Sequence, residues 1–299
     1  MIHRDWRSLS GSELETAYDQ SLKAPNMAEV LARCAQHSAS DWQAYGAPRR
    51  IPYGPKSNQG MDWFAPPTAS HQGQGAALIF LIHGGAWRSG EAKDYALGAT
   101  AWLAQGAHLV VPDFSSVLAC DGHLGRMLEE LQQAFALVQD MAPAMGVDVQ
   151  NIHVCGHSSG AHLAACLAVA TANTSTGARH PMASLLCCSG LYDLEPVRHS
   201  ARSAYLALTD EAVHALSPIR HPQAFSMPVH LMCGTLELPE FMRQSHEFAQ
   251  SLALSAAPVR LSWIEGLNHF EALESLALPT GAMHQAVLAT LKNAALSKP

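Results

Sequence analysis

The segment Gly156-His157-Ser158-Ser159-Gly160 constrains the fold more than any other part of the sequence, because it forms a G-x-S-x-G pattern. The apolar run 152–155 before it is typical of a strand, and the run 161–170 after it contains small and apolar residues without glycine or proline. Strand, tight turn and helix are the setting in which this pattern forms a nucleophile elbow. The two glycines would let strand and helix pass closely, and the strained turn would expose the hydroxyl. The alternative is an ordinary glycine-bounded turn.

Strand-like and helix-like segments alternate along the 299 residues. We expect strands at about 49–53, 61–64, 76–82, 108–111, 152–155, 184–189, 229–233 and 259–264. Between and after them we expect helices at 94–105, 124–141, 161–170, 239–254 and 282–295, with helical turns over 200–216. This alternation predicts the α/β class, with a doubly wound, mostly parallel sheet. The first two strands are expected to form an antiparallel edge.

The segment from about Met1 to Gly46 precedes every strand and is predicted to be helical over about 8–38, followed by a link at 41–46. Its apolar side chains are too few for a separate domain and still need burial. We therefore expect one domain over 1–299, in which residues 1–46 form a cap at the active-site end of the sheet. Together with 200–216, this cap would roof a pocket for compact substrates.

Composition and charge exclude several classes of function. A net charge of −7 disfavours nucleic acid and anionic membranes as partners. The sequence lacks an apolar run of the ~18 residues that a membrane span needs, and its first residues lack the apolar core of a signal peptide. The seven cysteines include no C-x-x-C pair, so a structural zinc site is not expected. These features predict a cytoplasmic protein without metal or cofactor, and leave a homodimer open.

Three candidate catalytic residues each follow a predicted strand, at the edge where ligands bind in parallel sheets. Ser158 is the candidate nucleophile, and a serine hydroxyl needs a base. His269 follows the last strand and is the candidate base, while Glu237 follows the strand before it and would orient His269 as the acid. Asp193 is the rival acid, since it also follows a strand between Ser158 and His269. His157 is expected to pack rather than react.

The glycine-rich stretch after the 76–82 strand is the candidate oxyanion hole. Gly84, Gly85 and Ala86 offer backbone N–H groups on a ribbon with almost no side chains, and the N–H of Ser159 would join them. Trp87 follows directly, and could either wall the pocket or pack beneath the loop. An aromatic leaving group would stack on Trp87 or Tyr192.

Several motifs resemble the α/β-hydrolase superfamily, in its H-G-G esterase branch and particularly its arylformamidase group. They are the H-G-G-x-W loop at 83–87, the elbow at 156–162, the D-L-E-P segment within 189–196, the P-E-F-x-R-Q-S helix at 239–245 and the N-H-F block at 268–270. The resemblance implies an α/β-hydrolase fold, with Ser158 as nucleophile, His269 as base and Glu237 at a position where the family usually has aspartate. It implies hydrolysis of a small-molecule ester or aryl N-formyl amide through an acyl-enzyme. The alternatives are a general short-chain carboxylesterase and a non-catalytic ligand-binding protein of this fold.

Overall fold

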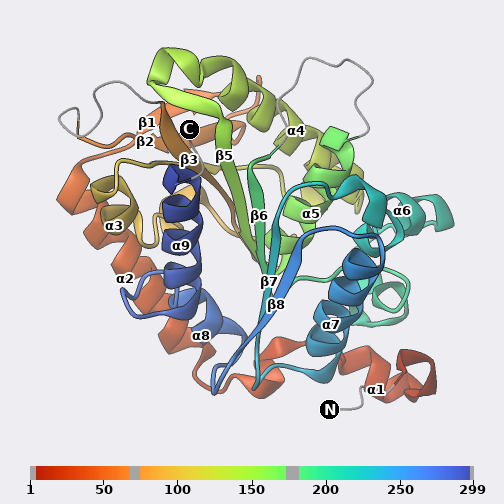
Figure 1. The fold of residues 1–299 in the computed structure, drawn as a ribbon. Helices are drawn as coiled ribbons and strands as arrows, with labels where there is room; N and C mark the ends of the chain where they lie inside the picture. Colours follow the sequence, from red (N-terminus) through yellow and green to blue (C-terminus); the bar gives the residue numbers. More distant parts are fainter. Residues whose placement is uncertain (1–4, 68–74, 173–181, 297–299) are drawn as a thin grey trace.

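An eight-stranded sheet forms the centre of the computed structural model, which describes residues 5–67, 75–172 and 182–296 (Figure 1). The strands are β1 (Arg49–Pro52), β2 (Gly60–Phe64), β3 (Ala76–Ile82), β4 (His108–Pro112), β5 (Val147–His157), β6 (Ser184–Cys188), β7 (Val229–Gly234) and β8 (Val259–Ile264). Their order is β1-β2-β4-β3-β5-β6-β7-β8. The β1–β2 and β2–β4 pairs are antiparallel and all others are parallel, which confirms the predicted mixed, mostly parallel sheet.

The register of the parallel strands brings their carboxyl ends to one edge. Ile82 at the end of β3 pairs with Gly156, and His157 at the end of β5 pairs with Cys188. At the other side Gly234 pairs with Ile264. The loops that follow these strands therefore open at the same edge, where the candidate catalytic residues were expected.

Helices cover both faces of the sheet (Figure 1). One face buries its apolar residues against α2 (Met27–Tyr45), α3 (Ala99–Ala104), α8 (His269–Glu274) and α9 (Ala282–Leu296). The other face packs against α4 (Leu124–Met141), α5 (Ser159–Ala172) and α7 (Pro239–Leu254), with α1 (Gly11–Thr16) and α6 (Asp210–Ala215) at its periphery. Among the described helices, none is long and apolar enough to cross a bilayer.

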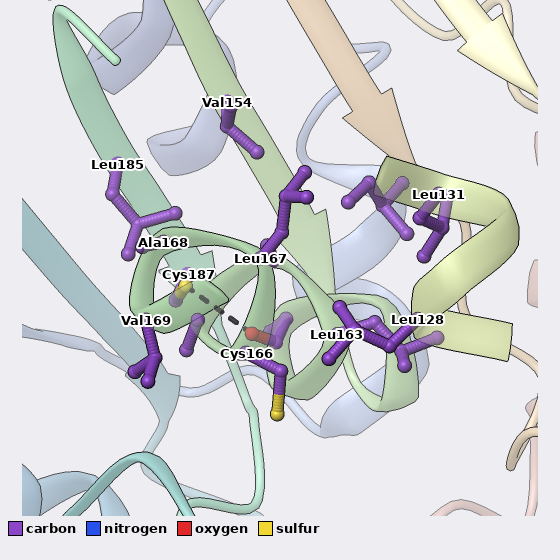
Figure 2. Packing of buried hydrophobic residues seen from close by; sticks show 14 of the residues in the cluster. Leu128, Leu131, Val154, Leu163, Cys166, Leu167, Ala168, Val169, Leu185 and Cys187 are labelled. Atoms are coloured by element: carbon purple, nitrogen blue, oxygen red, sulfur yellow. Dashed lines mark hydrogen bonds between the residues drawn. The ribbon is translucent and has the colours of Figure 1, made fainter. Parts of the chain in front are cut away.

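The helix after the elbow, α5, is buried on every side along residues 159–169. Figure 2 shows Leu163 and Leu167 of α5 beside Leu128 and Leu131 of α4, while other α5 side chains face Val154 of β5 and Leu185 of β6. A helix that is apolar all round is typical of a protein interior. Truncating one of these leucines to alanine would cost about 2–5 kcal/mol. All seven cysteines are buried and form no disulfide, which is typical of cysteines that pack as small apolar side chains.

The N-terminal segment crosses the carboxyl end of the sheet from one face to the other. Tyr18 packs in the α5 side of the core, whereas Val30 packs with α3 and α8 on the opposite side. Figure 1 shows this ribbon along the lower edge of the molecule, between α1 and α2. The predicted link at 41–46 is wrong, because α2 continues to Tyr45, where Trp42 packs against Phe64 with ring centroids 6.0 Å apart. Residues 1–4 of the predicted cap lie outside the described residues.

Candidate active site

Ser158 lies on a sharp turn between β5 and α5. Its φ of +56° is the left-handed backbone conformation that a residue other than glycine rarely adopts. A Cβ on Gly160 would come within 2.1 Å of the Ile82 carbonyl oxygen, and one on Gly156 within 2.5 Å of the Gly160 oxygen. The two glycines are therefore needed for the close approach of β3, β5 and α5, as the sequence pattern predicted.

A chain of hydrogen bonds joins the three candidate catalytic side chains. His269 Nε2 lies 2.9 Å from Ser158 Oγ, and His269 Nδ1 lies 2.7 Å from Glu237 Oε2. When Nδ1–H donates to the carboxylate, Nε2 is free to accept the serine proton. The rival acid Asp193 is held elsewhere, where it accepts from the N–H of Glu195 and faces Arg220 at 3.4 Å. The structure thus brings Glu237, and not Asp193, to His269.

The Glu237 carboxylate is fully buried and has donors on both oxygens. Oε1 accepts from Ser189 Oγ at 2.5 Å and from the Gly234 N–H at 2.8 Å, and Oε2 accepts from Gln20 Nε2 at 2.8 Å. Burial alone would raise the pKa of Glu237, but the charge and hydrogen bond of His269, with the Ser189 and Gly234 donors, lower it below its ordinary value. The acid is therefore ionised when it orients His269.

His269 is fixed by the start of α8 and by the rings around it. Asn268 caps α8 by accepting from the N–H of Phe270 at 3.0 Å. Phe241 lies edge-on to His269 at 5.0 Å. His157 Nε2–H donates to the His269 carbonyl oxygen at 2.9 Å, and burial, with repulsion from His269, lowers the pKa of His157 to about 3. His157 is thus a neutral packing residue beside the site.

The candidate oxyanion residues divide into two groups. Gly85 and Ala86 line the pocket at Ser158 with φ of +120° and +53°, and neither N–H has an acceptor among the described residues. Gly84 is buried, and a Cβ there would meet the His157 carbonyl oxygen at 3.0 Å and Ser158 Cβ at 3.4 Å. Ser159 is buried at the first position of α5, directly after the nucleophile. Gly84 therefore packs against the elbow, while Gly85 and Ala86 line the pocket.

The expectation that Trp87 and Tyr192 contact the substrate is corrected by their burial. Trp87 is only 2% exposed, and its indole N–H donates to His162 Nδ1 at 3.2 Å. Tyr192 is fully buried and stacks on Phe248 at 4.4 Å between ring centroids. Neither residue lines the pocket at Ser158. Large rings are stabilised by burial, and both find partners in the core that a pocket wall would not offer.

A pocket of about 650 Å³ opens onto Ser158 and His269. The N-terminal segment contributes Tyr18, Gln20, Met27 and Leu31 to its wall, and the 201–205 turn contributes Arg202 and Tyr205. The two predicted roof segments therefore do lie over this site. Sequence reasoning missed Gln20 and Arg202 as site residues, because each reaches the pocket through long-range contacts that no local motif records. It also missed Arg88, although Arg88 directly follows the predicted 83–87 loop. Among the described residues, no group of three or more His, Cys, Asp or Glu is placed to hold a metal ion.

A mostly parallel sheet with a serine on an elbow, followed in chain order by a carboxylate and a histidine, is the architecture of the α/β-hydrolases, and this chain is a hydrolase of that fold. Within that class the chain belongs to the BD-FAE family, whose model matches residues 61–252.

Relatives of known structure or name extend this similarity over most of the chain. Kynurenine formamidase from Danio rerio is 25% identical over 284 residues, which cover 91% of this chain and 93% of that protein. A structure from Silicibacter sp. tm1040 superposes with a TM-score of 0.75 at 23% identity, covering 92% of this chain and 99% of the other. Esterase B from Lactobacillus rhamnosis gives a TM-score of 0.70 at 17% identity, covering 89% and 95%. The structural likenesses support the fold alone.

Proposed function

We propose that this protein is a serine hydrolase that cleaves a small ester or an aryl N-formyl amide through an acyl-enzyme. The observation that carries the proposal is the hydrogen-bonded path from Glu237 through His269 to Ser158, which ends at a pocket beneath the N-terminal segment. A serine hydroxyl becomes a useful nucleophile when a base takes its proton during attack.

The reaction would proceed in two halves. Ser158 Oγ attacks the carbonyl carbon while His269 Nε2 takes the hydroxyl proton, and the N–H groups of Gly85, Ala86 and Ser159 stabilise the resulting oxyanion. His269 then gives the proton to the leaving amine or alcohol, which departs and leaves the acyl group on Ser158. Water, activated by His269, attacks the acyl-enzyme and releases the carboxylic acid. Glu237 stays ionised throughout and stabilises the imidazolium.

The roofed pocket and the relatives together favour a compact acyl group. Kynurenine formamidases from two fishes match over 91% of this chain at 25% and 22% identity. The formyl group is the smallest acyl group, and the aromatic rings of Tyr205 and Phe270 in the pocket wall suit an aryl leaving group. We therefore propose aryl formamides as the preferred class over longer esters.

The test compares steady-state kcat/KM for formanilide and p-nitrophenyl acetate, with fluorophosphonate labelling of the purified protein. We expect hydrolysis of both, labelling at Ser158, and loss of roughly 10⁶ in kcat in Ser158→Ala. Formanilide should be preferred after correction for the more reactive nitrophenyl leaving group, using phenyl acetate as the matched ester. A preference for the ester would indicate a general short-chain carboxylesterase. Absence of both labelling and turnover in folded protein would indicate a ligand-binding protein.

A further inference from the structure

The pocket at Ser158 contains two arginines that form no ion pair with any described carboxylate. Arg88 follows the oxyanion loop and Arg202 lies in the 3-10 turn Ala201–Ala204, and both line the pocket. Other arginines of the chain do form ion pairs, among them Arg50 with Asp62 and Arg243 with Glu240. A guanidinium in a protein is always charged, so the pocket carries cationic groups whose charge no neighbour cancels.

Arg202 is half-buried and held in one place. Its Nη2–H donates to the Tyr18 carbonyl oxygen at 2.8 Å, and its Nη1–H donates to Tyr205 Oη at 3.2 Å. The guanidinium carbon lies 5.3 Å from the centroid of the Trp87 ring. These are neutral partners, so they orient the group and leave its charge and its remaining N–H groups for a ligand.

Arg88 adds a second positive charge to the lining of the pocket that contains Arg202. Its guanidinium carbon lies 4.6 Å from the centroid of the Tyr205 ring, so Tyr205 contacts both arginines. Burial is the main cause that lowers the pKa of Arg202, and the charge of Arg88 lowers it further while Tyr205 opposes the shift. Two like charges this close are stabilised when an anion lies between them or beside them.

The remaining charged groups of the pocket do not supply that anion. Glu15 and Asp19 also line it, but both are exposed to water, and Asp19 already accepts from the N–H and hydroxyl of Ser21. Exposed carboxylates are screened by solvent and contribute little. His157 is neutral because burial lowers its pKa to about 3, and His269 is hydrogen-bonded to Glu237.

We propose, building on the proposed hydrolase function, that the preferred substrate carries a carboxylate on the part of the molecule that is not attacked, and that Arg202 binds it. The planar fork of a guanidinium matches the two oxygens of a carboxylate, which makes this contact specific as well as strong. Arg88 adds attraction from the more exposed side of the pocket. Arg202 would thus be a specificity-determining residue supplied by the roof, at the opposite end of the substrate from Ser158.

The first test is a ratio of kcat/KM for two matched substrates, 3-formamidobenzoate and formanilide, which differ only in a meta carboxylate with little electronic effect on the formamide. Charge-assisted hydrogen bonds contribute about 1.5–3 kcal/mol, so the wild-type ratio should be roughly 10–100. In Arg202→Gln the ratio should fall to about 1, and Arg202→Lys should keep part of it. Arg198→Gln is the matched control, because Arg198 loses the same charge but pairs with Glu195 and Asp210 outside the pocket lining. A wild-type ratio of 1 or less, or an unchanged ratio in Arg202→Gln, would overturn the proposal.

The second test does not depend on turnover. Ser158→Ala protein is titrated with benzoate and with benzamide by calorimetry, and a thermal melt checks that each variant is folded. We expect benzoate to bind at least roughly tenfold more tightly than benzamide, and expect Arg202→Gln to abolish the difference. Equal affinities would refute the carboxylate site even in an active hydrolase. Failure of the proposed function would appear instead as absence of Ser158-dependent turnover of every substrate.

Discussion

Glu237 is a longer acid than the aspartate implied for its position by the arylformamidase resemblance, yet its carboxylate reaches His269 at 2.7 Å. Ser189, Gly234 and Gln20 hold both oxygens in place. Because these donors favour the ionised form, the extra methylene does not leave the carboxylate loose. The position of the acid is thus determined by its surroundings as much as by its own side-chain length.

The acid assignment can be tested with two amide substitutions. Glu237→Gln should lower kcat by on the order of 10⁴, because an amide at the acid position stabilises the wrong histidine tautomer. Asp193→Asn should change kcat by less than about threefold, a small effect on the scale of that loss, since Asp193 faces Arg220 and the backbone instead of His269. Both are measured with one substrate in protein whose melting temperature has been checked. A greater loss from Asp193→Asn would show that the acid is wrongly assigned.

The sequence predicted Ser158, His269 and Glu237, with Asp193 left open as the rival acid, because chain order and strand ends restrict where such residues can lie. The sequence could not decide where Trp87 and Tyr192 lie. An aromatic next to a motif is compatible with either a pocket wall or the core, and only tertiary burial decides between them. Gln20 lies 217 residues from the carboxylate it binds, so no local pattern could have indicated its contact.

Among the elements, the N-terminal segment is hydrogen-bonded to the catalytic edge of the sheet at several points between Tyr18 and Arg33. The contacts are Tyr18 to Glu240 at 2.6 Å, Gln20 to Glu237 at 2.8 Å, Asn26 to Glu271 at 2.8 Å and Arg33 to Glu274 at 2.5 Å. These partners lie on α7 and α8 or on the turn before α7, the elements that carry or adjoin Glu237 and His269. The segment is therefore a positioning element for the site as well as its roof.

Removing the Gln20 amide should impair catalysis without touching any reacting atom. Gln20→Ala removes a hydrogen bond that favours ionised Glu237, so the pKa of Glu237 should rise and kcat should fall by roughly tenfold. Gln20→Glu should be worse, because it places a second carboxylate beside the first. The readout is the pH–rate profile, whose acid limb should move to higher pH. Gln36→Ala on the exposed side of α2 is the control, and an unmoved acid limb in both Gln20 variants would assign Gln20 a merely structural role.

The roof also predicts a preference for short acyl groups. The wall of the pocket at Ser158 includes Met27 and Leu31 of α2 and residues of the 201–205 turn. In a series of p-nitrophenyl esters, kcat/KM should be highest at roughly two to four acyl carbons and should fall steeply beyond, because longer chains meet the roof. A maximum at long chains would indicate an open, lipase-like groove.

Elements with strong apolar patterns were predicted well: β3, α4, α7 and β8 have the predicted bounds. Their boundaries are marked by local signals, such as Pro239 at the start of α7. The end of α2 is marked by Gly46, whose φ of +82° ends the helix directly after Tyr45, but the predicted link at 41–46 overlooked this signal. Residues 41–45 also make tertiary contacts that the sequence does not display, through packing of Trp42 on Phe64 and a hydrogen bond from Thr100 to Asp41.

At the scale of the whole molecule, burial lowers the pKa of several histidines, three of which lie in β5 and α5. His153 is hydrogen-bonded to Asn151 on β5 and to Ser184 on β6. His157 is hydrogen-bonded to the His269 carbonyl oxygen, and His162 to the Leu216 carbonyl oxygen. Burial lowers the pKa of His153 and His162 to about 4, and burial with repulsion from His269 lowers that of His157 to about 3. All three are therefore neutral in the folded protein near pH 6.

Stability should consequently fall as the pH drops below about 6.5, the ordinary pKa of histidine. Between pH 6.5 and about 4 the unfolded chain binds a proton on each of these side chains and the folded chain does not, so the free energy of unfolding rises with pH in this window. Each histidine contributes on the order of 1 kcal/mol per pH unit, so these three alone give a loss on the order of 4 kcal/mol from pH 7.5 to 5.5. Burial also lowers the pKa of His83 and His230, which add to this loss. Urea unfolding at a series of pH values measures this slope.

His153→Gln, a change in the interior of β5 outside the pocket at Ser158, should reduce the slope by about one proton. His123→Gln, at an exposed position of the surface, is the matched control for the loss of one imidazole. A wild-type stability that is flat from pH 7.5 to 5.5 would show that these histidines accept protons in the folded protein.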